Sequence, residues 1–118
     1  MHLVVTVPKW FWPEWIAEGD PAGSPESGEE WGYSVGVRPP INAGDRLYIV
    51  SHGLLRGYAP VTRVVTDHAR RWHIHCRGNA VACTIDQPVH GFGGFRKIWW
   101  KPEDEKPFPD WKTKGIIL

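Results

Sequence analysis

The sequence predicts a mainly β (α+β) fold, a small, partly open β-barrel of about six strands with one or two short helices. Short segments rich in β-branched and aromatic residues recur along the chain, which is typical of strands. The 13 glycines and 11 prolines are concentrated between these segments and predict tight turns. No segment has the long apolar period of a crossover helix, so a parallel α/β fold is not expected.

Length and composition predict one domain over residues 1–118. A domain typically takes about 100–150 residues, and the 42% hydrophobic and 23% charged residues of this chain are typical of a soluble globular protein. The first residues lack a secretory leader, and no later run approaches the ~20 apolar residues that span a bilayer. We therefore expect a cytoplasmic protein without membrane contact, whose two cysteines, Cys76 and Cys83, stay reduced.

The N-terminal part of the chain predicts a strand, a short helix and a loop. Residues 3–7 are largely β-branched and end at Pro8, which indicates a first strand. Pro13 lies where the first turn of a helix over residues 14–18 would begin. Residues 20–30 consist mainly of Gly, Pro, Ser and Glu, so we expect a solvated loop without a functional site.

The clearest strand of the sequence covers residues 46–50. A weak strand at residues 31–37 and a turn at residues 42–45 precede it. Residues 51–53 predict a tight connection, and residues 54–65 return as a long strand in which a glycine and a proline indicate a bulge or a sheet edge. A curled antiparallel pair is the simplest product.

Residues 71–76 and 80–85 predict a β-hairpin, because both segments alternate apolar and polar side chains on either side of a two-residue turn at 78–79. In that register Cys76 and Cys83 lie one diagonal apart, roughly 7–8 Å, which is too far for a disulfide. Both cysteines are expected to be buried as small apolar side chains.

The C-terminal part predicts one more strand and a tail. The strand follows the glycine-rich residues 91–94 and extends to Trp100. Residues 101–118 are charged and interrupted by prolines, so we expect an extended tail that wraps the barrel through Phe108 and Trp111.

Charge is distributed unevenly although the net charge is only +1. Residues 14–30 carry six acids and no Lys or Arg, whereas residues 31–101 carry ten bases and three acids. This asymmetry can produce a one-sided positive potential that attracts phosphates. The alternative is that these bases are ordinary solvated side chains.

The eight tryptophans are the most unusual feature of the composition. Aromatic planes beside cations suit unstacked bases, since a base stack contributes ~1–3 kcal/mol while the phosphate binds Lys or Arg. The alternative for each tryptophan is a place in the core. Trp99 and Trp100 cannot both face inward on one strand, because successive side chains point to opposite faces. Four tryptophans lie in short clusters beside Lys or Arg: Trp10, Trp12, Trp99 and Trp100.

Neither a metal site nor a catalytic motif is expected. His73, His75 and Cys76 are of zinc-ligand type, but His75 and Cys76 would point to opposite faces of their strand, and the C-x₂₋₄-C spacing is absent. The sequence has no Walker loop, dinucleotide fingerprint, G-x-S-x-G elbow or H-E-x-x-H motif. Ser51 and His52 are adjacent, so their side chains are expected to point in different directions and not to form a nucleophile–base pair. No cofactor is expected.

Two stretches, residues 44–53 (GDRLYIVSHG) and 56–64 (RGYAPVTRV), resemble the central signature of the PUA-like superfamily, which includes PUA, ASCH, EVE and YTH domains. In these families a Gly-Asp turn enters a strand, a short polar loop follows, and a glycine-containing strand returns. Ser51 and His52 look like the polar pair that borders the nucleic-acid pocket of EVE domains. The first strand, the Trp-rich segment and the short helix are similar to the start of EVE and ASCH domains.

The resemblance implies nucleic-acid binding more than catalysis. The G-x-K-x-x-E-x-R signature of ASCH domains, whose Lys and Glu line the active cleft of that family, is absent from this chain. YTH and EVE domains hold a modified base in an aromatic cage, for which Trp10, Trp12 and Trp31 are candidates by position.

These observations together predict a non-enzymatic nucleic-acid reader, with RNA favoured over DNA as its partner. One base would stack on Trp10 or Trp12, and Ser51 with His52 would bind a base edge. Arg38, Arg56 and Arg96 would contact phosphates. The residues predicted to bind nucleic acid are Lys9, Trp10, Trp12, Arg38, Ser51, His52, Arg56 and Arg96.

Two alternatives from other classes stay open at this point. The first is a small ASCH-like hydrolase or ribonuclease, with His52 or a carboxylate as general base. The second is a protein-interaction module of phage or mobile-element origin, with Trp99, Trp100 and Trp111 as anchors.

Overall fold

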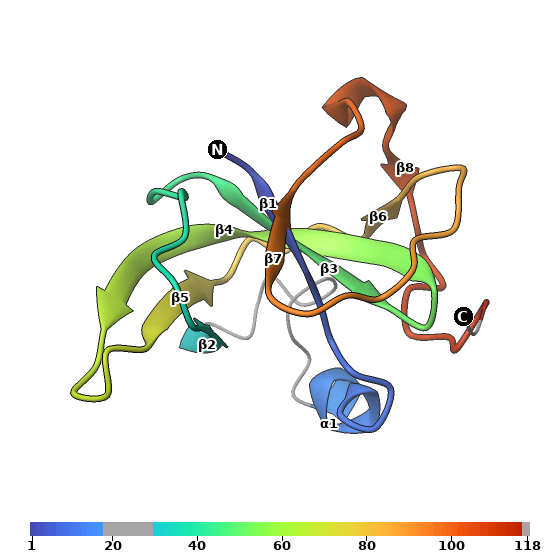
Figure 1. Ribbon diagram of the computed structural model, residues 1–118. Helices are drawn as coiled ribbons and strands as arrows, with labels where there is room; N and C mark the ends of the chain where they lie inside the picture. The colour runs from blue at the N-terminus through green and yellow to red at the C-terminus, as the bar shows by residue number, and fades with distance from the viewer. Residues whose placement is uncertain (18–29, 117–118) are drawn as a thin grey trace.

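Six strands form one mixed sheet in the order β2-β5-β4-β3-β1-β7, in a computed structural model that describes residues 1–17 and 30–116 (Figure 1). Strand β1 pairs with β3 in parallel, and the other pairs in this sheet are antiparallel. The prediction of a mainly β fold is therefore confirmed. The strands are β1 (Leu3–Thr6), β2 (Glu30–Val35), β3 (Arg46–Ser51), β4 (Leu54–Thr66), β5 (Trp72–Arg77) and β7 (Phe95–Lys97).

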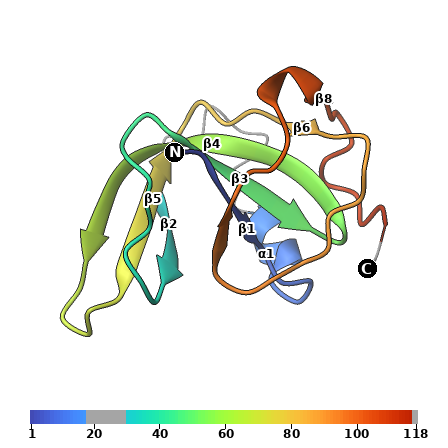
Figure 2. The ribbon, with the colours of Figure 1, turned by 45° about the horizontal axis from the view of Figure 1, so that its top comes forward.

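The sheet curls but does not close into a barrel. Strand β4 is 13 residues long, and it pairs with β3 through its first half and with β5 through its second half. Ile49 pairs with Gly57 and Val50 with Leu55, so Arg56 is the extra residue of a β-bulge. Gly57 has a φ of 149°, a conformation that side chains disfavour. Figure 2 shows β4 arching from one half of the sheet to the other.

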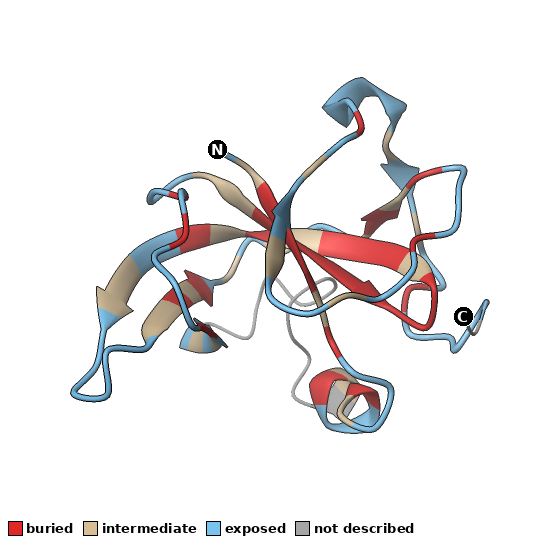
Figure 3. Ribbon diagram, viewed as in Figure 1, coloured by how far each residue is buried: buried red, intermediate tan, exposed pale blue. Residues whose placement is uncertain are grey.

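Strands β1 and β3, which lie next to each other in the sheet, are buried along most of their length, as Figure 3 shows. Because successive side chains alternate between faces, they supply two separate cores. Leu3 and Val5 pack with helix α1 (Trp12–Ala17) on one face. Val4 packs with Trp100 on the other face, where the small β6–β8 sheet (Cys83–Thr84 and Lys106–Pro107) lies.

The predicted hairpin between residues 71–76 and 80–85 is wrong. Residues 78 and 79 do turn with positive φ, but beyond them Val81 bridges to Tyr58 of β4. The reason is that Cys76 pairs with β2 on one side and with β4 on the other, so β5 has no free edge for a returning strand.

Both cysteines are buried and unpaired, as expected. Burial raises the pKa of the Cys76 thiol strongly and that of Cys83 to about 12. Neither thiol is a nucleophile at neutral pH, because the thiolate is the reactive form.

Residues 101–116 of the predicted tail are described, and they include regular structure. A 3₁₀ turn, η1 (Pro102–Asp104), precedes β8, and the chain then returns to the sheet with Phe108 half-buried and Trp111 buried. The predicted loop at residues 20–30 lies outside the described residues except for Glu30, which begins β2 and was wrongly placed in that loop. Along the described chain, no helix is both long and apolar enough to cross a bilayer.

Candidate nucleic-acid interface

Five of the predicted binding residues meet at one end of the sheet. Strands β1 and β3 run in parallel, so their C-terminal ends lie side by side, and the turn into β4 starts there. Lys9 follows β1, Ser51 ends β3, and the charges of Lys9 and Arg56 both act on His52. We call Lys9, Trp12, Ser51, His52 and Arg56 the strand-end site.

The β3–β4 connection brings Ser51 and His52 together. His52 and Gly53 have φ values of 52° and 77°, the two positive values of a type I′ hairpin turn. The imidazole folds back so that its Nδ1 lies 3.1 Å from Ser51 Oγ. The expectation that these neighbouring side chains point in different directions is therefore wrong, because it assumed ordinary strand geometry.

The hydrogen-bond directions at Ser51 argue against a nucleophile–base pair. Ser51 Oγ donates its only proton to the carbonyl of Val7 at 2.9 Å. His52 Nδ1 must then carry a proton and donate it to Ser51 Oγ, which leaves Nε2 as the acceptor of the neutral ring. A hydroxyl that accepts from the imidazole cannot be deprotonated by the same nitrogen.

His52 is held neutral. Its side chain is 6% exposed, and burial together with the positive charges of Arg56, Lys9 and Lys114 lowers its pKa. A neutral ring in a cationic surrounding can accept a hydrogen bond through Nε2, and an anion bound beside it would favour its protonation.

Arg56 is fully buried at 0% exposure, which corrects its predicted role as a surface phosphate contact. The bulge turns it inward, where Nε donates to the carbonyl of Ser51 at 2.9 Å. Nη1 donates to the carbonyls of Trp111 and Thr113, and Nη2 donates to that of Lys114. No carboxylate of the described residues pairs with it. Burial lowers the pKa of Arg56 to about 10, so the guanidinium stays charged at neutral pH.

The two tryptophans proposed as stacking platforms differ in burial. Trp12 is 1% exposed and packs edge-on against Trp111, with ring centroids 5.9 Å apart. It belongs to the core, so a stacking role in this arrangement is wrong, and its Nε1 has no partner within the described structure. Trp10 is 79% exposed and contacts Phe11 edge-on, with ring centroids 5.5 Å apart, so its indole is not covered by the core.

The remaining predicted residues lie away from the strand-end site. Arg38 lies 5.5 Å from the ring centroid of Trp72 and lines a surface pocket of about 590 Å³. Arg96 lies on β7, 4.3 Å from the ring centroid of Phe92. The ring beside Arg38 could not be predicted, because Trp72 is distant from it in the sequence, whereas Phe92 lies close to Arg96 along the chain. Trp31, a candidate for an aromatic cage, packs against Trp15 at 5.1 Å instead.

Comparisons with protein-family models, with curated proteins and with solved structures found no match. The site is therefore interpreted from its own geometry.

The candidate protein anchors are mostly buried. Trp99 is 50% exposed and Trp100 is 8% exposed, and the two rings contact each other edge-on with centroids 5.0 Å apart. Trp100 donates from Nε1 to Glu105 at 2.8 Å, and Trp111 is buried against Trp12. Only Trp99 of the three is accessible.

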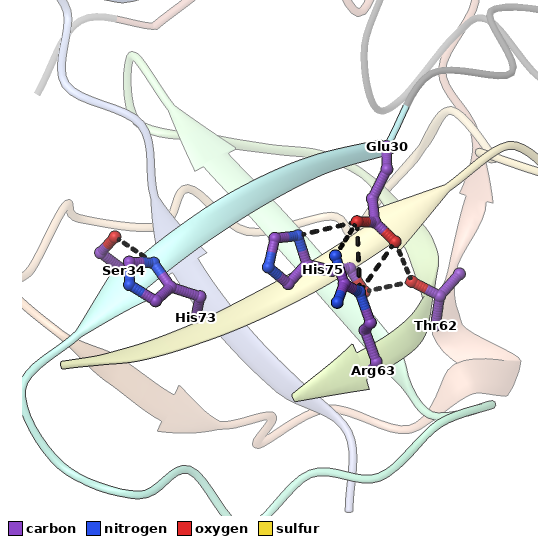
Figure 4. A network of polar contacts seen from close by, with 6 residues as sticks. All are labelled: Glu30, Ser34, Thr62, Arg63, His73 and His75. Carbon is purple, nitrogen blue, oxygen red and sulfur yellow. Dashed lines mark hydrogen bonds and ion pairs between the residues drawn. The ribbon is translucent and has the colours of Figure 1, made fainter. Parts of the chain in front are cut away.

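A second polar cluster, missed by the sequence analysis, lies on strands β2, β4 and β5 (Figure 4). Arg63 and Thr62 both donate to Glu30, and His75 Nδ1 lies 3.3 Å from the same carboxylate. The sequence analysis could not predict this cluster, because Glu30 and His75 come together only through the pairing of β2 with β5.

The same face of the sheet carries a Ser–His–Asp arrangement. His73 Nδ1 lies 2.9 Å from Ser34 Oγ, and His73 Nε2 lies 2.7 Å from Asp67. Both ring nitrogens are thus occupied by partners on either side of β5. Asp67 also accepts from the backbone N–H groups of Ala69 and Arg71, so the cluster closes the β4–β5 turn and ties β2 to it.

We expect acid to weaken the fold through His52. Its pKa is lower in the folded chain than the ordinary 6.5, so the unfolded chain binds more protons as the pH falls through that value. The free energy of unfolding should therefore decrease from pH 7.5 to pH 5.5, and His52→Gln should make the decrease shallower. Urea unfolding followed by tryptophan fluorescence at both pH values measures this.

The matched control for that experiment is His90→Gln, which changes an exposed histidine. His2 and His75 also have lowered pKa values, so part of the decrease should persist in every variant. A pH dependence as steep in His52→Gln as in the wild type would contradict the account of His52.

Proposed function

We propose that this chain is a non-catalytic nucleic-acid-binding module of the PUA-like kind, which holds a single-stranded segment at the strand-end site. The observation that supports it best is the chemistry around His52. Among the described residues, the charges that act on this ring are positive, those of Arg56, Lys9 and Lys114. A cluster of cations and hydrogen-bond donors is suited to an anion.

The exposed Trp10 adds a surface on which a base can stack beside these cations. It directly follows Lys9 and is 79% exposed, so a base can stack on its indole while the adjacent phosphate meets the ammonium group. Stacking of this kind is sequence-tolerant, because every base has a π-face. RNA is the favoured partner, with a modified DNA base as the alternative.

The charge balance of the described chain also supports a phosphate ligand. Residues 1–17 and 30–116 contain all 14 Lys and Arg but nine of the 13 acids. Five of these acids form ion pairs: Glu30, Asp45, Asp67, Asp86 and Glu105. Lys9, Arg38 and Arg96 make no ion pair with another described residue, so their charge is available to a polyanion.

The proposal excludes a catalytic role for Ser51 and His52. The Ser51 proton is directed to the Val7 carbonyl, and burial disfavours protonation of His52, so this pair supplies hydrogen bonds to a ligand and not an activated nucleophile.

Trp10→Ala should weaken binding of a short single-stranded oligouridine by the contribution of one base stack, ~1–3 kcal/mol or about 5- to 150-fold in Kd. The measurement is fluorescence anisotropy of the labelled oligonucleotide, with single-stranded and duplex RNA and DNA compared at low and at physiological salt. Binding should weaken as salt is raised, since each phosphate contact releases counterions.

The matched control is Trp99→Ala. Like Trp10, Trp99 is an exposed tryptophan in a segment that contains Lys or Arg, but it lies outside the strand-end site. The affinity of Trp99→Ala should equal that of the wild type. An equal loss of affinity in both variants would mean that Trp10 has no specific role in binding. If no oligonucleotide binds at all, the proposed function is rejected in favour of a protein partner at Trp99.

A further inference from the structure

The C-terminal segment lies over the strand-end site. Residues 108–116, which we call the strap, pass beside the β3–β4 turn (Figure 1). Trp111 packs on Trp12, and the carbonyls of Trp111, Thr113 and Lys114 accept hydrogen bonds from Arg56. The strap therefore covers the residues that the proposed function assigns to the ligand.

The buried charge of Arg56 is not matched by its partners. The guanidinium is 0% exposed, yet all four of its acceptors are neutral backbone carbonyls and no described carboxylate pairs with it. A buried cation without a counter-charge is costly. A phosphate would bind it more strongly, because it supplies the missing counter-charge and can accept two parallel hydrogen bonds from the guanidinium.

A second buried donor in the same place lacks an acceptor. Trp12 is 1% exposed, and its Nε1 has no hydrogen-bond partner within the described structure. Its ring lies 5.4 Å from the Arg56 guanidinium carbon and 6.2 Å from the His52 ring. The site thus places an unpartnered N–H donor beside a buried cation without a counter-charge, a combination that suits an anion.

We propose that the strap occupies the place of an anionic group, and that a phosphate of the bound nucleic acid displaces the strap carbonyls from Arg56. This inference rests on the proposed function for the source of the phosphate. The strap then competes with the phosphate for Arg56. The apparent affinity for nucleic acid is reduced according to the fraction of molecules in which the strap is bound to Arg56.

The strap is attached mainly by its backbone. Its residues from Lys112 to Ile116 are exposed, and Trp111 is the buried anchor. Gly115 adopts a φ of +48°, and a Cβ added there would lie 2.6 Å from Leu54 Cδ1 and 3.3 Å from Arg56 Nη2. A β-branched side chain at Gly115 would combine this strained positive φ with contacts on Leu54 and Arg56, and would therefore loosen the end of the strap without replacing Arg56 or Trp111.

The test compares Gly115→Val with the wild type and with Gly93→Val, a matched glycine substitution where a Cβ would meet nothing within 4 Å. Anisotropy titration with a 5′-phosphorylated oligouridine should show at least about fivefold tighter binding for Gly115→Val and wild-type affinity for Gly93→Val. In the wild type, the oligonucleotide should also accelerate tryptic cleavage after Lys112 and Lys114, followed by mass spectrometry.

Equal affinity of Gly115→Val and the wild type, together with slower cleavage in the presence of the oligonucleotide, would overturn the strap's displacement and leave the proposed function intact. If no variant binds nucleic acid, the proposed function fails and inorganic phosphate becomes the probe. Faster cleavage after Lys112 and Lys114 in phosphate than in chloride of equal ionic strength would still support an anion site under the strap. Unchanged cleavage would overturn it.

Discussion

Replacing Trp12 with alanine is expected to lower the free energy of unfolding by about 3–5 kcal/mol, the range for a large aromatic side chain removed from a packed core. Trp12 is among the largest fully buried side chains of the chain. It links helix α1 to the strap through Trp111 and to the β3–β4 turn through His52. Its removal would leave a cavity that these three elements share. Urea unfolding followed by circular dichroism measures the change.

Two further variants separate packing from chemistry at this position. Trp12→Phe should lower the free energy of unfolding much less, because phenylalanine fills most of the volume and lacks the unpartnered Nε1. Trp10→Ala, two residues away and exposed, should stay within about 0.5 kcal/mol of the wild type. A loss for Trp12→Ala as small as that for Trp10→Ala would show that Trp12 is not a core residue.

Arg56→Met is expected to lower the free energy of unfolding by about 2–4 kcal/mol. Two of its hydrogen bonds, to the carbonyls of Ser51 and Trp111, are buried, and an unsatisfied buried acceptor costs about 1–3 kcal/mol. The thioether can fill part of the space between Trp12 and Phe108 but cannot donate a hydrogen bond. Denaturant unfolding at pH 7 gives the difference.

The control for this variant is Arg71→Met, which removes an exposed guanidinium from the β4–β5 turn and should change stability by no more than about 0.5 kcal/mol. Tryptic cleavage after Lys112 should also be faster in Arg56→Met, since the strap loses three hydrogen bonds. Unchanged stability with unchanged cleavage would mean that Arg56 does not hold the strap.

Local sequence chemistry was sufficient to place most strands. β-branched residues between turn signals identified β1, β3 and β4, and Pro13 marked the start of the helix. The pairing of residues 80–85 could not be predicted in the same way. A turn at residues 78–79 fixes only the reversal of the chain, whereas the choice of partner depended on β2, which is distant in sequence and had already filled the edge of β5.

The strand-end site was predicted in part, since the polar pair after β3 and the basic, aromatic segment after β1 do come together. The burial of Arg56 was not predictable, because an arginine on a strand is normally solvated and three of its four acceptors lie 55 to 58 residues further along the chain. Trp10 and Trp12 could not be told apart either. Their burial depends on how α1 docks, which no local pattern reports.

Binding of nucleic acid at the strand-end site can be measured by a nitrogen–proton correlation NMR titration with single-stranded oligouridine. The indole resonance of Trp10 and the backbone amides of Lys9, His52 and Lys114 should shift together with one affinity, while the indole resonance of Trp99 should not move. Shifts confined to Trp99, or to the pocket between Arg38 and Trp72, would show that the oligonucleotide binds elsewhere.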